Sequence, residues 1–160
     1  MNRLFSTIIA LAVLLAGGCT SATGMRKPAP GLDDGAQIDI IVSGIHPPEG
    51  VVRVALFDSA EGFPERNGGV LRSAEVQADD DAVRISFGEL PSGEYAVSVH
   101  HDRDGDGRMA TDRIGRPLEP YGTSNNVRSQ FGPPTFAAAA FTAAGGPLVI
   151  EITLVGREDE

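Results

Sequence analysis

Short stretches in which hydrophobic and polar residues alternate recur along most of this chain, and turn-forming residues separate them. Alternation with a period of two places successive side chains on opposite faces of a β-strand. The clearest stretches are residues 37–43, 51–58, 82–87, 95–101 and 147–155. The 20 glycines and 11 prolines among 160 residues favour turns and leave little helix. We therefore predict an all-β fold, an antiparallel β-sandwich of about seven strands with one long irregular loop.

Three local patterns refine this prediction. The turn GIHPPEG at residues 44–50 predicts a hairpin between the strands on either side of it. Residues 135–143 are expected to be an extended strand, because prolines before them and glycines after them leave little room for a helix. The pattern L-P-x-G-x-Y-x-V at residues 90–97 looks like a strand pair of transthyretin-like and carboxypeptidase-regulatory-like sandwiches. The strand count also fits an immunoglobulin-like arrangement.

An export signal is predicted at residues 1–18. Arg3 precedes an apolar run at residues 4–15, which suits a signal-peptide core and is short for a membrane span. Small residues then lead to Cys19, the single cysteine of the chain. This arrangement resembles a bacterial lipobox, so we predict that Cys19 is lipidated and anchors the protein to a membrane. Ordinary cleavage after Gly18 is the alternative.

The segments after the signal predict the remaining domain organisation. Residues 19–36 are rich in Ser, Thr, Gly, Pro and Ala, and we expect them to form a lipidated, flexible tether. One β-sandwich domain is expected at residues 37–155, followed by a charged tail at residues 156–160. Thr20 replaces the aspartate that favours retention at the inner membrane in such lipoproteins. The predicted location is therefore the periplasmic face of the outer membrane.

The charge of the chain restricts its partners. With 13 Lys+Arg against 22 Asp+Glu, the formal net charge is −9. An acidic chain repels phosphate backbones and attracts cations, so nucleic-acid binding is disfavoured. The predicted partners are a membrane, through the lipid anchor, and an envelope polymer or protein.

An aspartate-rich segment follows the predicted strand at residues 95–101. Asp102, Asp104 and Asp106 occupy positions 1, 3 and 5 of a loop in which Gly107 is position 6 and the carbonyl of Arg108 is position 7. Calcium is bound by oxygen ligands at this spacing in EF-hand loops. The pattern therefore predicts a calcium site on the end of a strand.

The match to an EF-hand loop is incomplete. Position 12 is Arg113, where an EF-hand has a bidentate glutamate. Asp112 is the predicted substitute, and Glu119 is a second candidate. Without the strong last ligand we expect weak affinity, with a dissociation constant of about 10⁻⁴ to 10⁻³ M. The alternative is an Asp/Gly turn without metal, in which neighbouring arginines balance the aspartates.

About 30 residues after Asp102 lack a hydrophobic period, and an ordered loop of this length needs contacts that brace it. The residues predicted to brace it are His101, Gly107, Glu119, Tyr121 and Asn125. His101 lies on the predicted core face of its strand, so we interpret it as a hydrogen-bonding residue rather than a catalytic base.

Several of these segments together resemble a known family. VRVALFDSAEGFP, LPSGEYAVSVHHDRDGDG, EPYGTSNN and FGPPTF occur in this order in the chain. They resemble the domain-of-unknown-function 2141 family of exported bacterial proteins over residues 37–155. The family loop, H-D-x-N-x-N-G, corresponds to residues 101–107 here. Ala110 stands where a later acidic residue is often found, which shifts weight to Asp112. The resemblance implies export and fold, and no established activity.

The sequence thus predicts a cell-envelope lipoprotein with a non-catalytic binding or structural domain and a calcium-type loop. No G-x-S-x-G elbow, P-loop or dinucleotide fingerprint is present in the sequence. One alternative is a metal-dependent envelope hydrolase that uses His101 and the aspartates. The other is a carbohydrate-binding module that uses Tyr121, Asn125 and Asn126 as its platform.

Overall fold

The computed structural model describes residues 35–129 and 132–156. All of them belong to one compact unit, Gly31–Glu160. The predicted signal, Cys19 and nearly all of the predicted tether and charged tail lie outside the described residues.

Over the described residues the fold is almost entirely β, as predicted, with eight strands in two sheets. The strands are β1 (Ala36–Ser43), β2 (Val51–Phe57), β3 (Val70–Gln77), β4 (Ala82–Leu90), β5 (Gly93–Asp102), β6 (Tyr121–Thr123), β7 (Phe141–Ala143) and β8 (Gly146–Thr153). A 3₁₀ turn, η1 (Ser124–Asn126), and a single helical turn, α1 (Phe136–Ala139), lie between β6 and β7.

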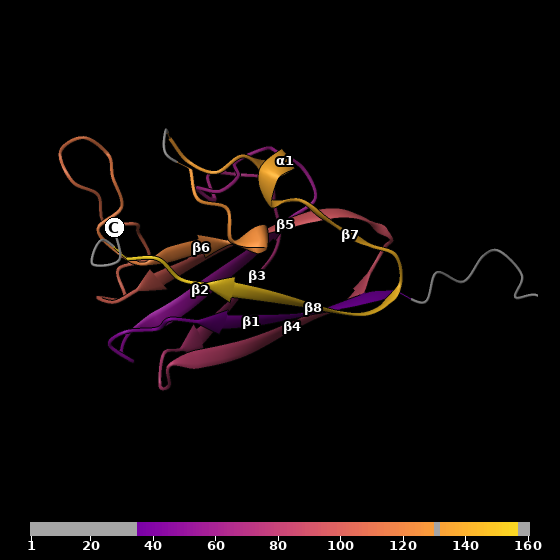
Figure 1. The fold of residues 1–160 in the computed structure, drawn as a ribbon, viewed down its shortest axis with the longest axis horizontal. Coiled ribbons are helices and arrows are strands. Elements are labelled where there is room, and N and C mark those ends of the chain that lie inside the picture. The colour runs from indigo at the N-terminus through magenta and orange to yellow at the C-terminus, as the bar shows by residue number, and fades with distance from the viewer. Residues whose placement is uncertain (1–34, 130–131, 157–160) are drawn as a thin grey trace, which may run out of the picture. The chain divides into compact units, whose positions relative to one another are not determined.

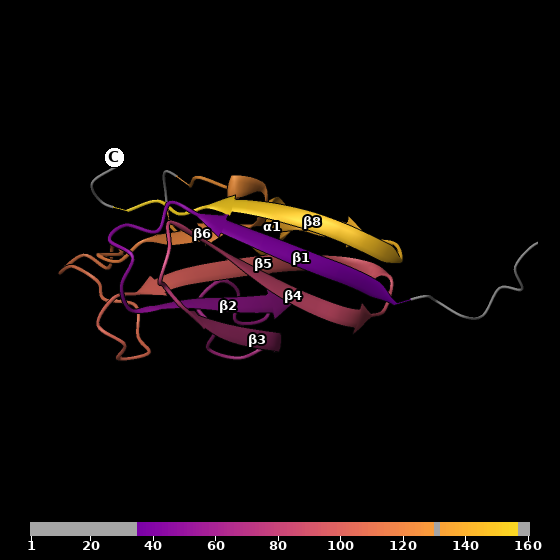
Figure 2. The same cartoon turned by 90° about the horizontal axis from the view of Figure 1, so that it is seen from below.

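One sheet has the strand order β4-β1-β8 and the other β3-β2-β5-β6, with β7 paired to β5 (Figures 1 and 2). The strand pairs are antiparallel except β1 and β8, which run parallel with Ile38 opposite Leu148. The predicted antiparallel β-sandwich is therefore confirmed, with this parallel pair as an exception. The chain passes from β7, which pairs with β5 of the other sheet, into β8 through residues 144–145, and β8 runs in the same direction as β1.

The predicted hairpin between β1 and β2 is also wrong. β1 pairs with β4 and β8, whereas β2 pairs with β3 and β5, so the turn at residues 44–50 crosses from one sheet to the other. Gly44 and Gly50, at the two ends of this turn, both have positive φ, 78° and 76°. Alternation predicted both strands correctly, but it does not identify their partners.

The strand predicted at residues 135–143 is shorter than expected, because α1 occupies its first part. The side chain of Thr135 accepts a hydrogen bond from Ala138 N and caps the turn, and the alanines that follow favour helix. The chain becomes extended at Ala140, and β7 then pairs with the beginning of β5.

The hydrophobic core lies between the two sheets. Alternate residues of β1 and β2 fill it, and those of β5 complete it from the centre of the larger sheet. The fully buried members include Ile38, Ile40, Val42, Val52, Val54, Leu56 and Val97. Each aliphatic side chain of this kind contributes about 1.5–3 kcal/mol on burial. β5 is buried on both faces from Tyr95 to Asp102, so it is a rigid support for the loop that follows.

Candidate metal centre at the end of strand β5

Strand β5 ends in three buried polar residues, His100, His101 and Asp102. His100 lies opposite Arg53 of β2, and Asp102 lies opposite Val51. Because β5 is central in its sheet, these side chains lose most of their contact with water. Buried polar groups require partners, and the next contacts supply them.

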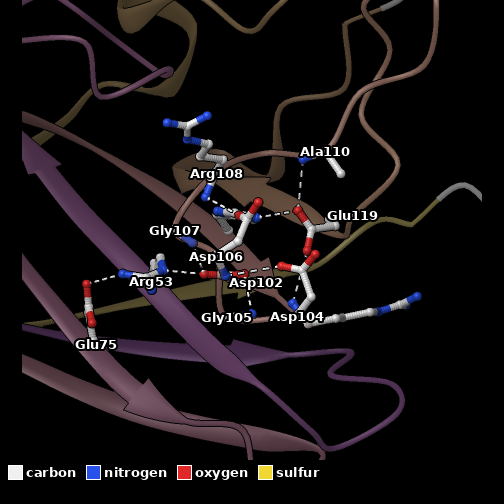
Figure 3. Close-up of polar contacts among 12 residues, drawn as sticks. Arg53, Glu75, Asp102, Asp104, Gly105, Asp106, Gly107, Arg108, Ala110 and Glu119 are labelled. Atoms are coloured by element: carbon white, nitrogen blue, oxygen red, sulfur yellow. Dashed lines mark hydrogen bonds and ion pairs between the residues drawn. The ribbon is translucent and has the colours of Figure 1, made fainter.

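The three aspartates fold the loop around their own side chains (Figure 3). Asp102 accepts hydrogen bonds from Gly105 N at 2.8 Å and from Gly107 N at 2.9 Å. Asp104 Oδ1 accepts from Asp106 N at 3.1 Å, and Asp106 Oδ1 accepts from Arg108 N at 2.7 Å. These local bonds turn the chain at each step, and Gly107, with φ of 78°, adopts the left-handed conformation that the turn requires.

The loop brings one ligand atom from each of Asp102, Asp104 and Asp106 to within 4.8 Å of one another. Asp102 is fully buried, while Asp104 and Asp106 are exposed. Within the described part of the chain, Oδ2 of Asp104 and Oδ2 of Asp106 accept no hydrogen bond. These oxygens are free to bind a hard cation, which prefers carboxylate ligands.

Arg53 is the positive partner of Asp102, and sequence reasoning missed this role. Its Nε donates to Asp102 Oδ2 at 2.6 Å, and its Nη1 forms an ion pair with Glu75. Burial raises the pKa of the Asp102 carboxyl, but hydrogen bonds from Arg53, Gly107 and Gly105 outweigh burial and hold the pKa below its ordinary value. A charged residue within an otherwise hydrophobic strand, V-R-V, is the signal that could have identified Arg53.

Glu119 closes the other end of the loop, where it accepts three hydrogen bonds. His100 Nε2 lies 2.9 Å from Glu119 Oε2, Ala110 N donates to the same oxygen at 2.9 Å, and Arg103 N donates to Oε1 at 3.0 Å. Burial raises the pKa of Glu119, and the bonds from Ala110, His100 and Arg103 outweigh it, so the pKa is lowered.

Two acidic groups therefore lie at this site. The first is Asp102, Asp104 and Asp106, and the second joins Asp102 and Glu119 with His100. The ligand atoms of the second group also lie within 4.8 Å of one another, and all three residues are buried. Both oxygens of Glu119 already accept hydrogen bonds, as do both oxygens of Asp102. The arrangement therefore joins the loop to the sheet, while the open ligand atoms belong to Asp104 and Asp106.

Asp112, the predicted last ligand, lies in a separate turn. It accepts hydrogen bonds from the backbone N–H groups of Ile114 and Arg116 and forms an ion pair with the Arg116 side chain at 2.9 Å. The backbone bond from Arg116 is the largest of the effects that lower the pKa of Asp112 to about 2. The structure does not bring Asp112 into either acidic group.

The other predicted bracing residues contact the backbone of neighbouring segments. His101 Nε2 lies 2.7 Å from Glu49 O. Tyr121 begins β6, opposite His100, and forms a bridge with Val155. Asn125 donates from Nδ2 to the carbonyls of Ala138 and Ala140, at 3.1 and 2.9 Å. Gly50 lies so close to the start of the loop that a Cβ would be 2.4 Å from Asp102 O.

A family model described as "uncharacterized protein conserved in bacteria (DUF2141)" matches residues 40–151, from the middle of β1 into β8. The chain belongs to this family. The DUF2141 match includes the whole aspartate loop and both acidic groups, so the predicted resemblance is confirmed. No match to the chain was found among curated proteins or among solved structures. Within residues 35–129 and 132–156, no helix has the length and hydrophobicity needed to cross a membrane.

Proposed function

We propose that this protein is an exported, lipid-anchored envelope protein whose β-sandwich is a non-catalytic binding or structural domain stabilised by calcium in the Asp102–Asp106 loop. Cys19 would carry the lipid, and the sandwich would face the periplasm from the outer membrane. The signal-like residues 1–18 and the lipobox-like approach to Cys19 support this location.

The observation that carries the calcium proposal is the position of three carboxylates within 4.8 Å in a loop that leaves two oxygens free. Three carboxylates this close repel one another, and Arg53 pairs with Asp102 alone among them. A divalent cation would neutralise the remaining charge of Asp104 and Asp106. The Arg108 carbonyl, at position 7 of the loop, is the proposed backbone ligand.

The environment of His101 supports a non-catalytic role. A general base must reach a substrate, whereas His101 is fully buried, and its Nε2 contacts the carbonyl of Glu49. His101 does not line the cleft of about 610 Å³ that lies beside the long loop. This favours the bracing role over the hydrolase alternative.

The asparagines proposed as a carbohydrate platform are occupied by backbone contacts. Asn125 donates to two carbonyls near α1, and Asn126 accepts from Thr153 N at 2.8 Å and donates to Glu151 O. Tyr121 is partly buried at the start of β6. These contacts leave little of the platform for a sugar.

Thermal and urea unfolding with excess calcium or with chelator tests the calcium proposal. Calcium at about a hundred times its dissociation constant should raise the free energy of unfolding by about 2.7 kcal/mol. Asp104→Asn should remove most of this increment, because it removes a free ligand charge. Asp79→Asn makes the same change at an exposed position in the connection between β3 and β4 and should keep the increment. The absence of any calcium-dependent shift in the parent protein would refute the proposal.

A further inference from the structure

A cleft of about 610 Å³ lies beside the aspartate loop, and Arg103 of that loop forms part of its wall. Its walls come from the turn after β1, the beginning and end of the long loop, and the chain after β8. The lining residues that matter here are His46, Arg103, Arg128, Leu118, Leu154 and Val155. Its volume is within the usual range for small-molecule sites, about 300–1,000 Å³.

The charge of this cleft is opposite to that of the chain. Arg103 and Arg128 both line it, and no described lining residue is acidic, although the chain has a net charge of −9. Among the described residues, neither arginine forms an ion pair with a carboxylate, whereas Arg53, Arg84 and Arg116 each do. Positive groups without counter-ions in a concave site attract anions.

Arg103 is held at the wall of the cleft. Its Nη2 donates to His46 O at 2.6 Å, while its buried Nε has no hydrogen-bond partner within the described residues. Its backbone N–H is fixed by Glu119. Arg128 is exposed, so it can turn towards a ligand. One arginine is thus preorganised and the other is adaptable, a combination that suits binding of a carboxylate or phosphate.

Part of the remaining wall is apolar. Leu118 is 40% exposed although it is a large hydrophobic residue, and Val155 and the largely buried Leu154 line the same cleft together with polar Thr153. Exposed apolar surface beside a charged group favours a ligand that has both characters.

We propose that this cleft binds a small amphiphilic anion, with its carboxylate or phosphate group between Arg103 and Arg128 and its short apolar chain against Leu118, Leu154 and Val155. The overall negative charge favours such a ligand over a polyanion, which would be repelled outside the cleft. The proposal is independent of calcium binding.

Titration of the ¹⁵N-labelled full chain, followed by NMR amide shifts, tests it. The probes are hexyl phosphate, hexanoate, inorganic phosphate and hexylamine. We expect saturable shifts at Gly44 and Gly156, which line the cleft, and none at Gly88, which lies in β4. Hexyl phosphate or hexanoate should bind several times more tightly than inorganic phosphate, and hexylamine should not bind. The better of the two organic anions identifies the head group.

Variants assign the binding to the arginines. Arg128→Gln and Arg103→Gln should each weaken binding about tenfold, the loss expected for one charge-assisted contact. Arg113→Gln makes the same charge change outside the cleft and should leave affinity unchanged. Because Arg103 also contacts His46 O, Arg128→Gln is the decisive variant if Arg103→Gln unfolds.

Three results would overturn the proposal. The first is no saturable shift with either organic anion in the millimolar range. The second is equal binding by the Arg128→Gln variant. The third concerns the acidic residues at 158–160, which follow the cleft residue Gly156. Binding that appears only after these are changed to Gln and Asn would show that the chain's own tail is the natural occupant.

Discussion

Glu119→Gln tests whether one buried carboxylate joins the long loop to the sheet. The carboxylate accepts three hydrogen bonds, from His100, Arg103 and Ala110, and Glu119 is only 7% exposed. Glutamine has nearly the same shape but only one accepting oxygen and no charge, so at least one buried donor loses its acceptor. Hydrogen bonds to charged groups contribute about 1.5–3 kcal/mol, and an unpaired buried donor costs about 1–3 kcal/mol. We expect the free energy of unfolding to fall by about 2–4 kcal/mol.

The measurement is urea unfolding followed by far-ultraviolet circular dichroism, with chelator present. Glu94→Gln makes the same change at an exposed position of β5, and its effect should stay within about 0.5 kcal/mol. The calcium-dependent increment should persist in Glu119→Gln, because both oxygens of Glu119 are already used by donors. Asp104→Asn should lose most of the calcium-dependent increment and change the stability in chelator little. Equal effects of Glu119→Gln and Glu94→Gln would refute the role of Glu119.

Three further predictions concern the surroundings of the loop. Gly50→Ala should destabilise the protein by at least about 2 kcal/mol in urea unfolding, because φ is +76° and the new Cβ would meet Asp102 O at 2.4 Å. Gly88→Ala is the control, because its Cβ would meet nothing within 4 Å, and equal losses of stability in the two variants would contradict the argument. The pKa values of Asp102 and Glu119 are lowered on folding from the ordinary 3.8 and 4.5, so their stabilising contribution is complete above those values and is lost as the pH falls through the lower folded-state values. The midpoint urea concentration should therefore decrease as the pH is lowered from about 6 to about 3, and it should decrease less in Glu119→Gln. An unchanged midpoint in the parent protein would contradict the predicted direction of this pH dependence. Cys19→Ala should move the protein from the membrane fraction to the soluble fraction, and unchanged partitioning would rule out a lipid anchor at this residue.

The strands could be predicted from the sequence because alternation is a local property. β1, β2 and β8 begin and end close to the predicted residues, and the all-β class follows from them. Their partners depend on which segments meet after long excursions of the chain. The parallel pairing of β1 with β8 brings Ile38 opposite Leu148, and no local pattern indicates this. For the same reason, the local sequence did not reveal that residues 44–50 cross between the two sheets and do not form a hairpin.

The aspartate loop likewise has local contacts, which the sequence predicts, and contacts with distant residues, which it does not. The bonds among Asp102, Asp104, Asp106 and their neighbours span at most five residues, and the spacing of the aspartates predicts where these side chains gather. Arg53 lies 49 positions from Asp102. Glu119 lies 19 positions from His100, and the sequence predicted it as a bracing residue and as an alternative ligand to Asp112, without indicating which groups it contacts. The spacing of an EF-hand loop favours Asp112 as the last ligand. Asp112 instead accepts hydrogen bonds from Ile114 and Arg116 in its own turn, so it does not need to join the aspartate loop.

The charges around Asp102 explain why weak calcium binding is expected. Arg53 already neutralises Asp102, so the unpaired negative charge comes from Asp104 and Asp106. Both of these residues are exposed, where water and salt screen their attraction for a cation. Asp112 is paired with Arg116, so a strong last ligand is missing. Since Arg53, Glu119 and the backbone bonds already hold the loop in place, calcium would add stability to a formed loop. A site of this kind fits the proposed export of the domain to a compartment with a high calcium concentration. Loss of calcium would then loosen the loop without unfolding the sandwich.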